Sequence, residues 1–183
     1  MFNRAAAVLL LFTMFSAGVA QAQVTPLIFE RESIRIESPS EPLFSGKTET
    51  AKDPILPVAP PHAPFTYDVE IRPEDALRLE YIHSLNELND TTGVMIAFGA
   101  PSMVSLPVMQ TPTPVDAFFI AKDGTILQIY PNVVLANLKQ EVMAPVPVKA
   151  FLFLRSGSAA ARGIRPHDVV VSKKFVAAPP LIK

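Results

Sequence analysis

A tight turn at Lys122-Asp123-Gly124 constrains the fold of this chain more than any other segment. Apolar and β-branched residues precede the turn at 115–120 and follow it at 125–130. An Asp-Gly pair between two such runs is a strong signal for a β-hairpin, because glycine readily adopts the left-handed backbone that the turn requires. The sequence therefore predicts two consecutive antiparallel strands at this point.

Further strands are predicted on both sides of this hairpin. Apolar and polar residues alternate at 65–71, and a shorter alternation at 33–37 lies within a predicted strand at 27–37. Apolar runs predict four more strands, at 94–98, 103–106, 146–154 and 164–171. Two short helices are expected: one opens at Arg72-Pro73, and the other covers 157–162 and ends at Gly163. We therefore expect a mainly β, α+β domain that forms a compact, mostly antiparallel β-barrel-like fold.

The first residues of the chain are typical of a secretory signal peptide. Arg4 precedes an apolar and small-residue stretch from Ala5 to Ala17, and Ala20-Gln21-Ala22 fits a cleavage site. The apolar run is shorter than the ~20 residues that a membrane-spanning helix needs. We expect a Sec-type signal peptide at 1–22, cleavage before Gln23, no transmembrane segment after cleavage, and a periplasmic or secreted protein. The alternative is an uncleaved membrane anchor.

Three other regions follow the leader. Residues 23–64 are rich in proline, which lacks a backbone donor and disfavours helix, so we expect one strand at 27–37 and then a mobile linker. The compact domain is predicted at 65–171, and residues 172–183 are predicted to form a loose tail.

Composition excludes several classes of function. The chain has no cysteine, which removes disulfides, thiolate metal sites and cysteine nucleophiles. Its formal net charge of −1 provides none of the clustered positive charge that nucleic-acid binding requires. The familiar catalytic, phosphate-binding and dinucleotide-binding motifs are missing as well. We therefore expect no cofactor, no metal and no nucleic-acid partner.

Each of the three histidines has a structural and a functional interpretation. His83 could share one helix face with Glu80 and Glu87 and so hold a metal ion or act as a base, although a solvated helix end is the favoured interpretation. His167 lies beside Asp168 and is interpreted as a turn former. His62 lies in the proline-rich linker, where we expect nothing to hold it rigidly.

Asp116 and the loop before it form the second candidate site. Asp116 enters a buried strand, so its carboxylate must find hydrogen-bond partners. It is therefore either a structural anchor, which is favoured, or a pocket acid with a shifted pKa. Met103 and Met109 are interpreted as core residues. The polar, proline-containing stretch 110–114 joins two apolar strands, a place where binding sites are often built.

Several segments, in this order, resemble the DUF192 (UPF0127) family, a group of uncharacterised function. Its opening strand and helix are similar to residues 65–74, and its apolar strand to Gly93-Val94-Met95-Ile96-Ala97-Phe98. Its proline-led segment is similar to Pro101–Leu106, and its core segment to Pro114–Ile126, of which Asp116–Ile126 is specific, as is Gly157–Ile164. The closing segments are similar to Pro147-Val148-Lys149 and Gly157–Ile164. The resemblance implies the same small β-rich domain over 65–171.

Departures from the family pattern concern polar positions. Of the family's Trp-Met-Lys-Asn-Thr stretch only Thr111 is kept, with Gln110 as a rough substitute for asparagine, and His167 stands where the family has glycine. We therefore favour a non-catalytic module that binds a small ligand, a glycan or an envelope protein through the Gln110–Asp116 loop. Its predicted ligand-binding residues are Gln110, Thr111, Asp116 and His83. The alternative is a periplasmic hydrolase-type enzyme that uses Asp116 with His83 or His167.

Overall fold

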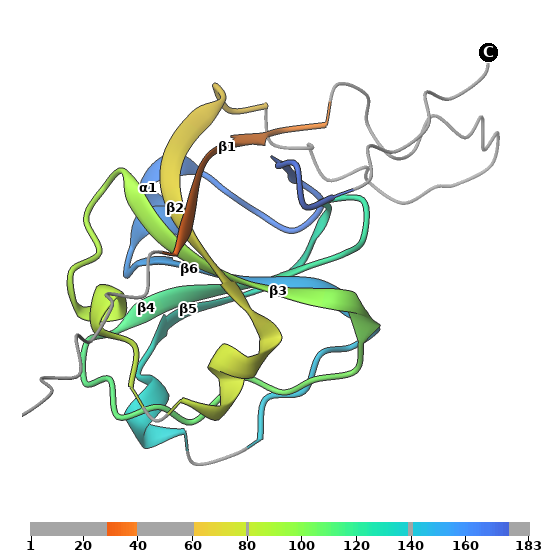
Figure 1. The fold of residues 1–183 in the computed structure, drawn as a ribbon. Helices are drawn as coiled ribbons and strands as arrows, with labels where there is room; N and C mark the ends of the chain where they lie inside the picture. Colours follow the sequence, from red (N-terminus) through yellow and green to blue (C-terminus); the bar gives the residue numbers. More distant parts are fainter. Residues whose placement is uncertain (1–28, 40–60, 80, 139–140, 176–183) are drawn as a thin grey trace, which may run out of the picture.

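A computed structural model describes residues 29–39, 61–79, 81–138 and 141–175 (Figure 1). The predicted leader, most of the predicted linker and of the predicted tail, and Glu80 lie outside the described residues. Seven strands form one sheet in the order β5-β4-β6-β3-β2-β1-β7. They are β1 (Glu30–Glu37), β2 (Phe65–Pro73), β3 (Thr92–Ser102), β4 (Val115–Ile120), β5 (Ile126–Val133), β6 (Val148–Arg155) and β7 (Val169–Val171).

The sheet is mostly antiparallel and curls until its two ends meet at one corner. Only β2 and β3 run parallel, whereas the other neighbouring strands are antiparallel. At the corner, Thr125 bridges Val169, and the Val170 N–H donates to the Gly124 carbonyl at 2.8 Å. The hairpin turn between β4 and β5 therefore touches the last strand, and the sheet has the shape of a half-barrel (Figure 1).

The predicted β-hairpin is confirmed, with β4 and β5 on either side of Gly124, whose φ is +89°. Two other strand predictions need correction. Residues 103–106 form no strand and make only an isolated bridge between Ser105 and Met143. The final strand begins at Val169 instead of residue 164, because His167 has a φ of +77° and interrupts extended backbone.

Of the two predicted helices, the first is replaced by shorter 3₁₀ turns and the second is present. The helix expected after Pro73 is instead two 3₁₀ turns, η1 (Glu74–Arg78) and η2 (His83–Asn86). Their buried side chains, Ala76, Ile82 and Leu85, lack the spacing of one continuous α-helical face. A third 3₁₀ turn, η3, covers Leu135–Asn137. The second prediction is confirmed by α1 (Ser158–Arg162), which ends at Gly163 in the left-handed conformation.

No helix among the described residues combines the length and the apolar character needed to cross a bilayer.

Two hydrophobic clusters cover opposite faces of the curled sheet, and β4 contributes to both. Phe119 lies in one cluster, where its ring meets that of Phe151 edge-on at 4.9 Å. Phe118 lies in the other cluster, which includes residues of β1, β2 and α1. All six residues of β4 are buried, because β5 and β6 flank the strand and both of its faces are covered. Asp116 shares the face of Phe118, since side chains alternate along a strand.

Candidate functional site

Asp116 is fully enclosed and binds backbone donors from two directions. Its side chain accepts the N–H of Asn132 at 2.9 Å, of Gly157 at 3.2 Å and of Ala159 at 2.9 Å. Asn132 lies where the pairing of β4 with β5 shifts register, and its φ of +53° places its N–H beside the carboxylate. The carboxylate thus ties β5 and the start of α1 to β4. This geometry fits the favoured interpretation of Asp116 as a structural anchor.

The structure brings none of the histidines proposed as its catalytic partners to Asp116. The His167 N–H bonds to Ile126, which pairs with Ile120 at the far end of β4. Four residues of extended strand separate that end from Asp116, which corresponds to about 13 Å. His83 begins η2, whose neighbours Ile82 and Leu85 pack in the cluster on the other face of the sheet.

His83 instead belongs to a hydrogen-bonded network at the surface. Its Nε2 lies 2.9 Å from Glu87 Oε1, and its Nδ1 lies 3.2 Å from the Tyr81 hydroxyl. The Asn86 side-chain amide donates to the same hydroxyl at 2.8 Å. Of the two carboxylates expected beside His83, Glu87 contacts it and Glu80 lies outside the described residues.

The predicted ligand loop lies next to this network. The Thr113 hydroxyl donates to the side-chain oxygen Oδ1 of Asn86 at 2.6 Å, which ties the loop to η2. Gln110 is exposed and Thr111 is fully buried. The Thr111 N–H donates to the Met109 carbonyl, whereas its hydroxyl has no hydrogen-bond partner among the described residues. Gln110, Thr111 and Asp116 therefore do not converge on one exposed surface.

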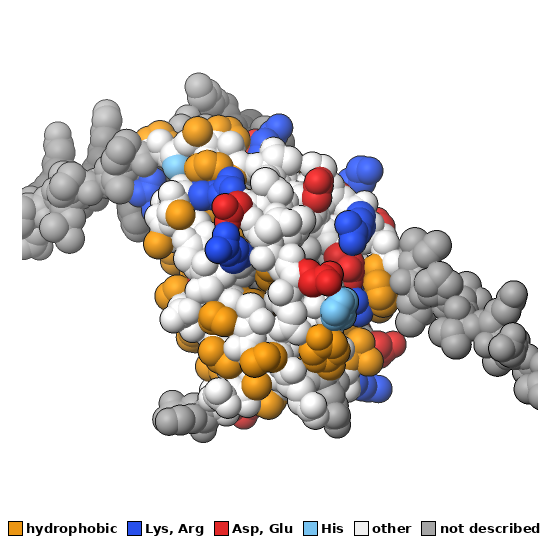
Figure 2. Space-filling model, turned by 90° about the vertical axis from the view of Figure 1, so that its left-hand side faces the viewer, with side chains coloured by type: hydrophobic (Ala, Val, Ile, Leu, Met, Phe, Trp, Pro, Cys, Tyr) orange, Lys and Arg blue, Asp and Glu red, His pale blue; other side chains and the backbone are white. Residues whose placement is uncertain are grey.

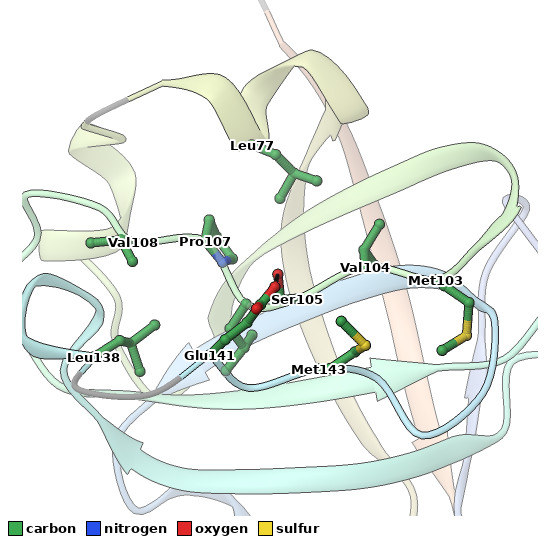
Figure 3. Close-up of a pocket in the computed structure, with 10 residues that line it drawn as sticks. Leu77, Met103, Val104, Ser105, Pro107, Val108, Leu138, Glu141 and Met143 are labelled. Carbon is green, nitrogen blue, oxygen red and sulfur yellow. Dashed lines mark hydrogen bonds between the residues drawn. The ribbon is translucent and has the colours of Figure 1, made fainter.

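A groove with a volume of about 690 Å³, lined mainly by residues with apolar side chains, opens on the surface of the domain. Leu77 points toward it from η1, Met103 and Met143 lie on one side, and Val108 and Leu138 lie on the other (Figure 3). Between them, the Ser105 hydroxyl donates to Glu141 at 2.9 Å. The groove is also lined by Val104, Leu106 and Pro107.

Three apolar side chains on the rim of this groove are more than half exposed to solvent. Val108 is 67% exposed, Met103 54% and Met143 53%. Figure 2 shows hydrophobic side chains gathered on the lower part of one face of the molecule, below a band of charged side chains. Large exposed apolar patches on a protein surface commonly mark binding sites.

The sequence interpretation missed this groove and placed Met103 in the core. The lining residues come from three separate segments, 77, 103–108 and 138–143. A pattern within one segment therefore cannot predict the groove. The bonds that join two of these segments run from the Leu106 N–H to the Val142 carbonyl and from the Ala144 N–H to the Val104 carbonyl. The available signal was the density of methionine and valine at 103–109, within and just after a predicted strand.

His62 also departs from expectation, because it is held firmly. Its Nε2 lies 2.8 Å from Oδ2 of the buried Asp168, and its Nδ1 lies 2.8 Å from the Ala63 carbonyl oxygen. The His62 N–H donates to the Ser38 hydroxyl, and its ring packs 5.3 Å from Phe65. The end of the predicted linker is therefore fastened to the turn before β7, and the expectation that nothing would hold His62 was wrong.

A second buried polar group lies under α1. The Tyr67 side chain is fully buried, and burial raises the pKa of the Tyr67 phenol, partly offset by the nearby Arg162 guanidinium. The guanidinium lies 4.9 Å from the ring centre of Tyr67 and 4.9 Å from that of Phe65. Tyr67 therefore stays neutral across the physiological pH range and contributes to packing.

Comparisons with known proteins place this geometry among uncharacterised relatives. Residues 61–172 match the DUF192 family, which is described as "Uncharacterized ACR". No curated protein matches the chain significantly.

Two crystal structures share the fold. A candidate transcription regulator from Sinorhizobium meliloti has 22% identity and a TM-score of 0.60, and the match covers 80% of this chain and 97% of that one. A protein of unknown function from Novosphingobium aromaticivorans has 20% identity and a TM-score of 0.57, and covers 76% of this chain and 84% of its own. At these identities the likeness describes the fold alone.

Proposed function

The chain belongs to the DUF192 family, and we propose that it is an exported, non-catalytic binding protein whose ligand occupies the apolar groove between Leu77 and Met143. The groove itself is the observation that carries this proposal. Its volume of about 690 Å³ lies within the range of about 300–1,000 Å³ that is usual for small-molecule sites. Its rim is open, so a ligand can enter without any rearrangement of the sheet.

The lining indicates which kind of small molecule would fit. Eight of the ten lining residues have apolar side chains, although polar atoms make up about half of the exposed lining. Methionine side chains adapt to ligands of different shape. One polar pair, Ser105 and Glu141, interrupts the apolar wall. Such a lining suits an amphipathic molecule with an apolar body and one hydrogen-bond donor that reaches Glu141.

The groove lies beside the Gln110–Asp116 loop that the sequence predicted as the ligand site. Val108 on the rim lies two residues before Gln110, so the 110–114 loop adjoins the groove but does not line it. The hydrolase alternative has less support, because the Asp116 carboxylate is occupied by three backbone donors and is separated from His83 and His167. A ligand site built on Asp116 would require those bonds to break.

A neutral fluorescent probe provides the first test. N-phenyl-1-naphthylamine should bind the mature protein with increased emission, and the Met103→Gln, Met143→Gln double variant should bind it about tenfold more weakly, because each change replaces apolar wall with an amide. Fluorescence titration measures both affinities. Both side chains are more than half exposed, so the thermal midpoint should change little.

Val171→Gln is the matched control, since Val171 is 43% exposed on β7 and outside the groove lining. Its affinity for the probe should equal that of the unmodified protein. Equal affinity in the methionine double variant would refute the groove as the site.

Export is the second part of the proposal, and the leader-like pattern at 1–22 supports it. Expression of the full chain in a Gram-negative host should give a mature protein in the periplasmic fraction, with an N-terminus at Gln23. Mass spectrometry of the fractionated protein measures both the compartment and the terminus. A full-length chain retained in the cytoplasm or the membrane fraction would contradict export.

A further inference from the structure

Three polar side chains form a connected series of contacts around η2: Tyr81 precedes the turn, His83 begins it, and Glu87 follows it. Tyr81 is 47% exposed, and the side chains of His83 and Glu87 are 71% and 65% exposed. Because the network lies at the surface, a reagent in solution can reach the Tyr81 hydroxyl directly. No described residue of the apolar groove belongs to the network.

The distances in this network are compatible with a neutral His83 ring that accepts the Tyr81 proton. The Asn86 amide is a donor to the Tyr81 oxygen, so the hydroxyl proton is free to point elsewhere. The remaining partner is His83 Nδ1, which can receive that proton only as an unprotonated ring nitrogen. The hydrogen of the neutral ring then lies on Nε2 and is donated to Glu87. In the arrangement relevant to reactivity, Tyr81 O–H donates to His83 Nδ1, and His83 Nε2–H donates to Glu87.

The same order of groups activates hydroxyl nucleophiles in many enzymes. A carboxylate orients an imidazole, and the imidazole removes the proton from the attacking hydroxyl. Here the Asn86 amide adds a donor that stabilises negative charge on the phenolic oxygen, and the bond from Thr113 holds the Asn86 side chain in place. Each contact lies between 2.6 and 3.2 Å, within hydrogen-bond reach.

We propose that Tyr81 is an activated surface nucleophile that accepts acyl groups from small activated esters, with His83 as its general base and Glu87 as the positioning residue. This activity is separate from ligand binding in the groove. The Tyr81 oxygen forms a bond to the acyl carbon, and the bond from that carbon to the leaving oxygen breaks. The leaving group departs as an oxyanion with the bonding electron pair, while the phenolic proton passes to His83 Nδ1 and then to the leaving group. The product is an O-acyl tyrosine.

p-Nitrophenyl acetate is the probe for this step. With the full mature protein, we expect one equivalent of p-nitrophenolate to be released and one acetyl group to appear on Tyr81 in peptide mass spectra. The rate constant for acetylation of Tyr81 should fall at least tenfold in His83→Gln, because general-base catalysis typically contributes a factor of about 100 or more in enclosed sites and less in exposed ones. Tyr81→Phe should lose the modification at this position.

Two further variants separate positioning from folding. Glu87→Gln should slow acetylation while leaving the thermal midpoint unchanged, and Glu87→Asp should restore part of the rate. Tyr130, whose hydroxyl accepts from Gln128 and contacts no histidine in the described structure, is the internal reference tyrosine. An unmodified Tyr81, or equal Tyr81 acetylation rates in the unmodified protein and His83→Gln, would overturn the proposal, whatever the groove variants show.

Discussion

Replacing Asp116 by alanine is expected to lower the free energy of unfolding by about 3–5 kcal/mol. Three buried backbone N–H groups would lose their acceptor, and each loss costs about 1–3 kcal/mol. Local relaxation of the backbone reduces the sum. These groups belong to Asn132, Gly157 and Ala159, so the change would loosen both the β5 register shift and the start of α1. Urea unfolding followed by circular dichroism measures the loss. Asp116→Asn should recover only part of the lost stability, because the asparagine NH₂ group would face backbone N–H groups, which are also donors.

Asp123→Ala is the matched control for this prediction. Asp123 also accepts a backbone N–H, from Thr125 at 3.0 Å, but it lies in a partly exposed turn and serves one donor. Its loss should cost about 1 kcal/mol. Equal losses in the two variants would show that Asp116 is not the anchor described. Folded Asp116→Asn should also bind the fluorescent probe with unchanged affinity, whereas a pocket acid in contact with the ligand would alter it.

Gly124→Ala is expected to destabilise the fold by about 3 kcal/mol or more, through backbone strain of about 1–3 kcal/mol and an added steric overlap. The φ of +89° at Gly124 is a conformation that residues with a Cβ rarely adopt. A Cβ placed there would also overlap the carbonyl oxygen of Val170, so the hairpin turn would have to move away from β7. Thermal and urea unfolding measure the effect.

Substitutions at two other glycines distinguish backbone strain from steric overlap. Gly157 has a φ of +86° but nothing within 4 Å of a new Cβ, so Gly157→Ala should show strain alone, about 1–2 kcal/mol. Gly99 has neither an unusual φ nor a close neighbour, so Gly99→Ala should change stability by less than about 0.5 kcal/mol. If Gly124→Ala matched Gly157→Ala, the contact between the turn and β7 would contribute little.

The features that could be predicted from sequence depend on neighbouring residues. The Asp-Gly turn with its flanking strands, and the short α1 ended by Gly163, both follow from chemistry contained within a few positions. Asp116 belongs to the same group, because a carboxylate inside an apolar strand must find partners whatever the rest of the fold. Which donors it would find depends on Gly157 and Ala159, which are distant in sequence, and these could not be named in advance.

The features that were missed depend on contacts between distant segments. His62 is fastened by a residue 106 positions away, and no local pattern around either partner announces that bond. The groove is assembled from three segments, and its apolar residues look like core residues in the sequence. The 3₁₀ turns after Pro73 pack on the sheet, where η1 contacts both β2 and β3 and η2 contacts β3. Such contacts exist only once the strands are arranged.

The resemblance stated from the sequence also points to a position with an unusual backbone conformation in the structure. His167 stands where the resemblance places a glycine, and its φ of +77° lies in the left-handed region. A histidine there is strained by roughly 1–3 kcal/mol. The neighbouring Asp168 compensates, because its carboxylate binds both the Arg165 N–H and His62 and so fixes the turn. The departure from the family pattern is thus tolerated where a second contact stabilises the backbone.

The position of β1 between β2 and β7 has a kinetic consequence. Glu37 pairs with Val169, so one of the first strands of the chain needs one of the last as its neighbour. Contacts between such distant residues make folding slow, because the intervening chain must be ordered before they form. During synthesis, the nascent chain therefore cannot complete its sheet until residue 171 has emerged from the ribosome.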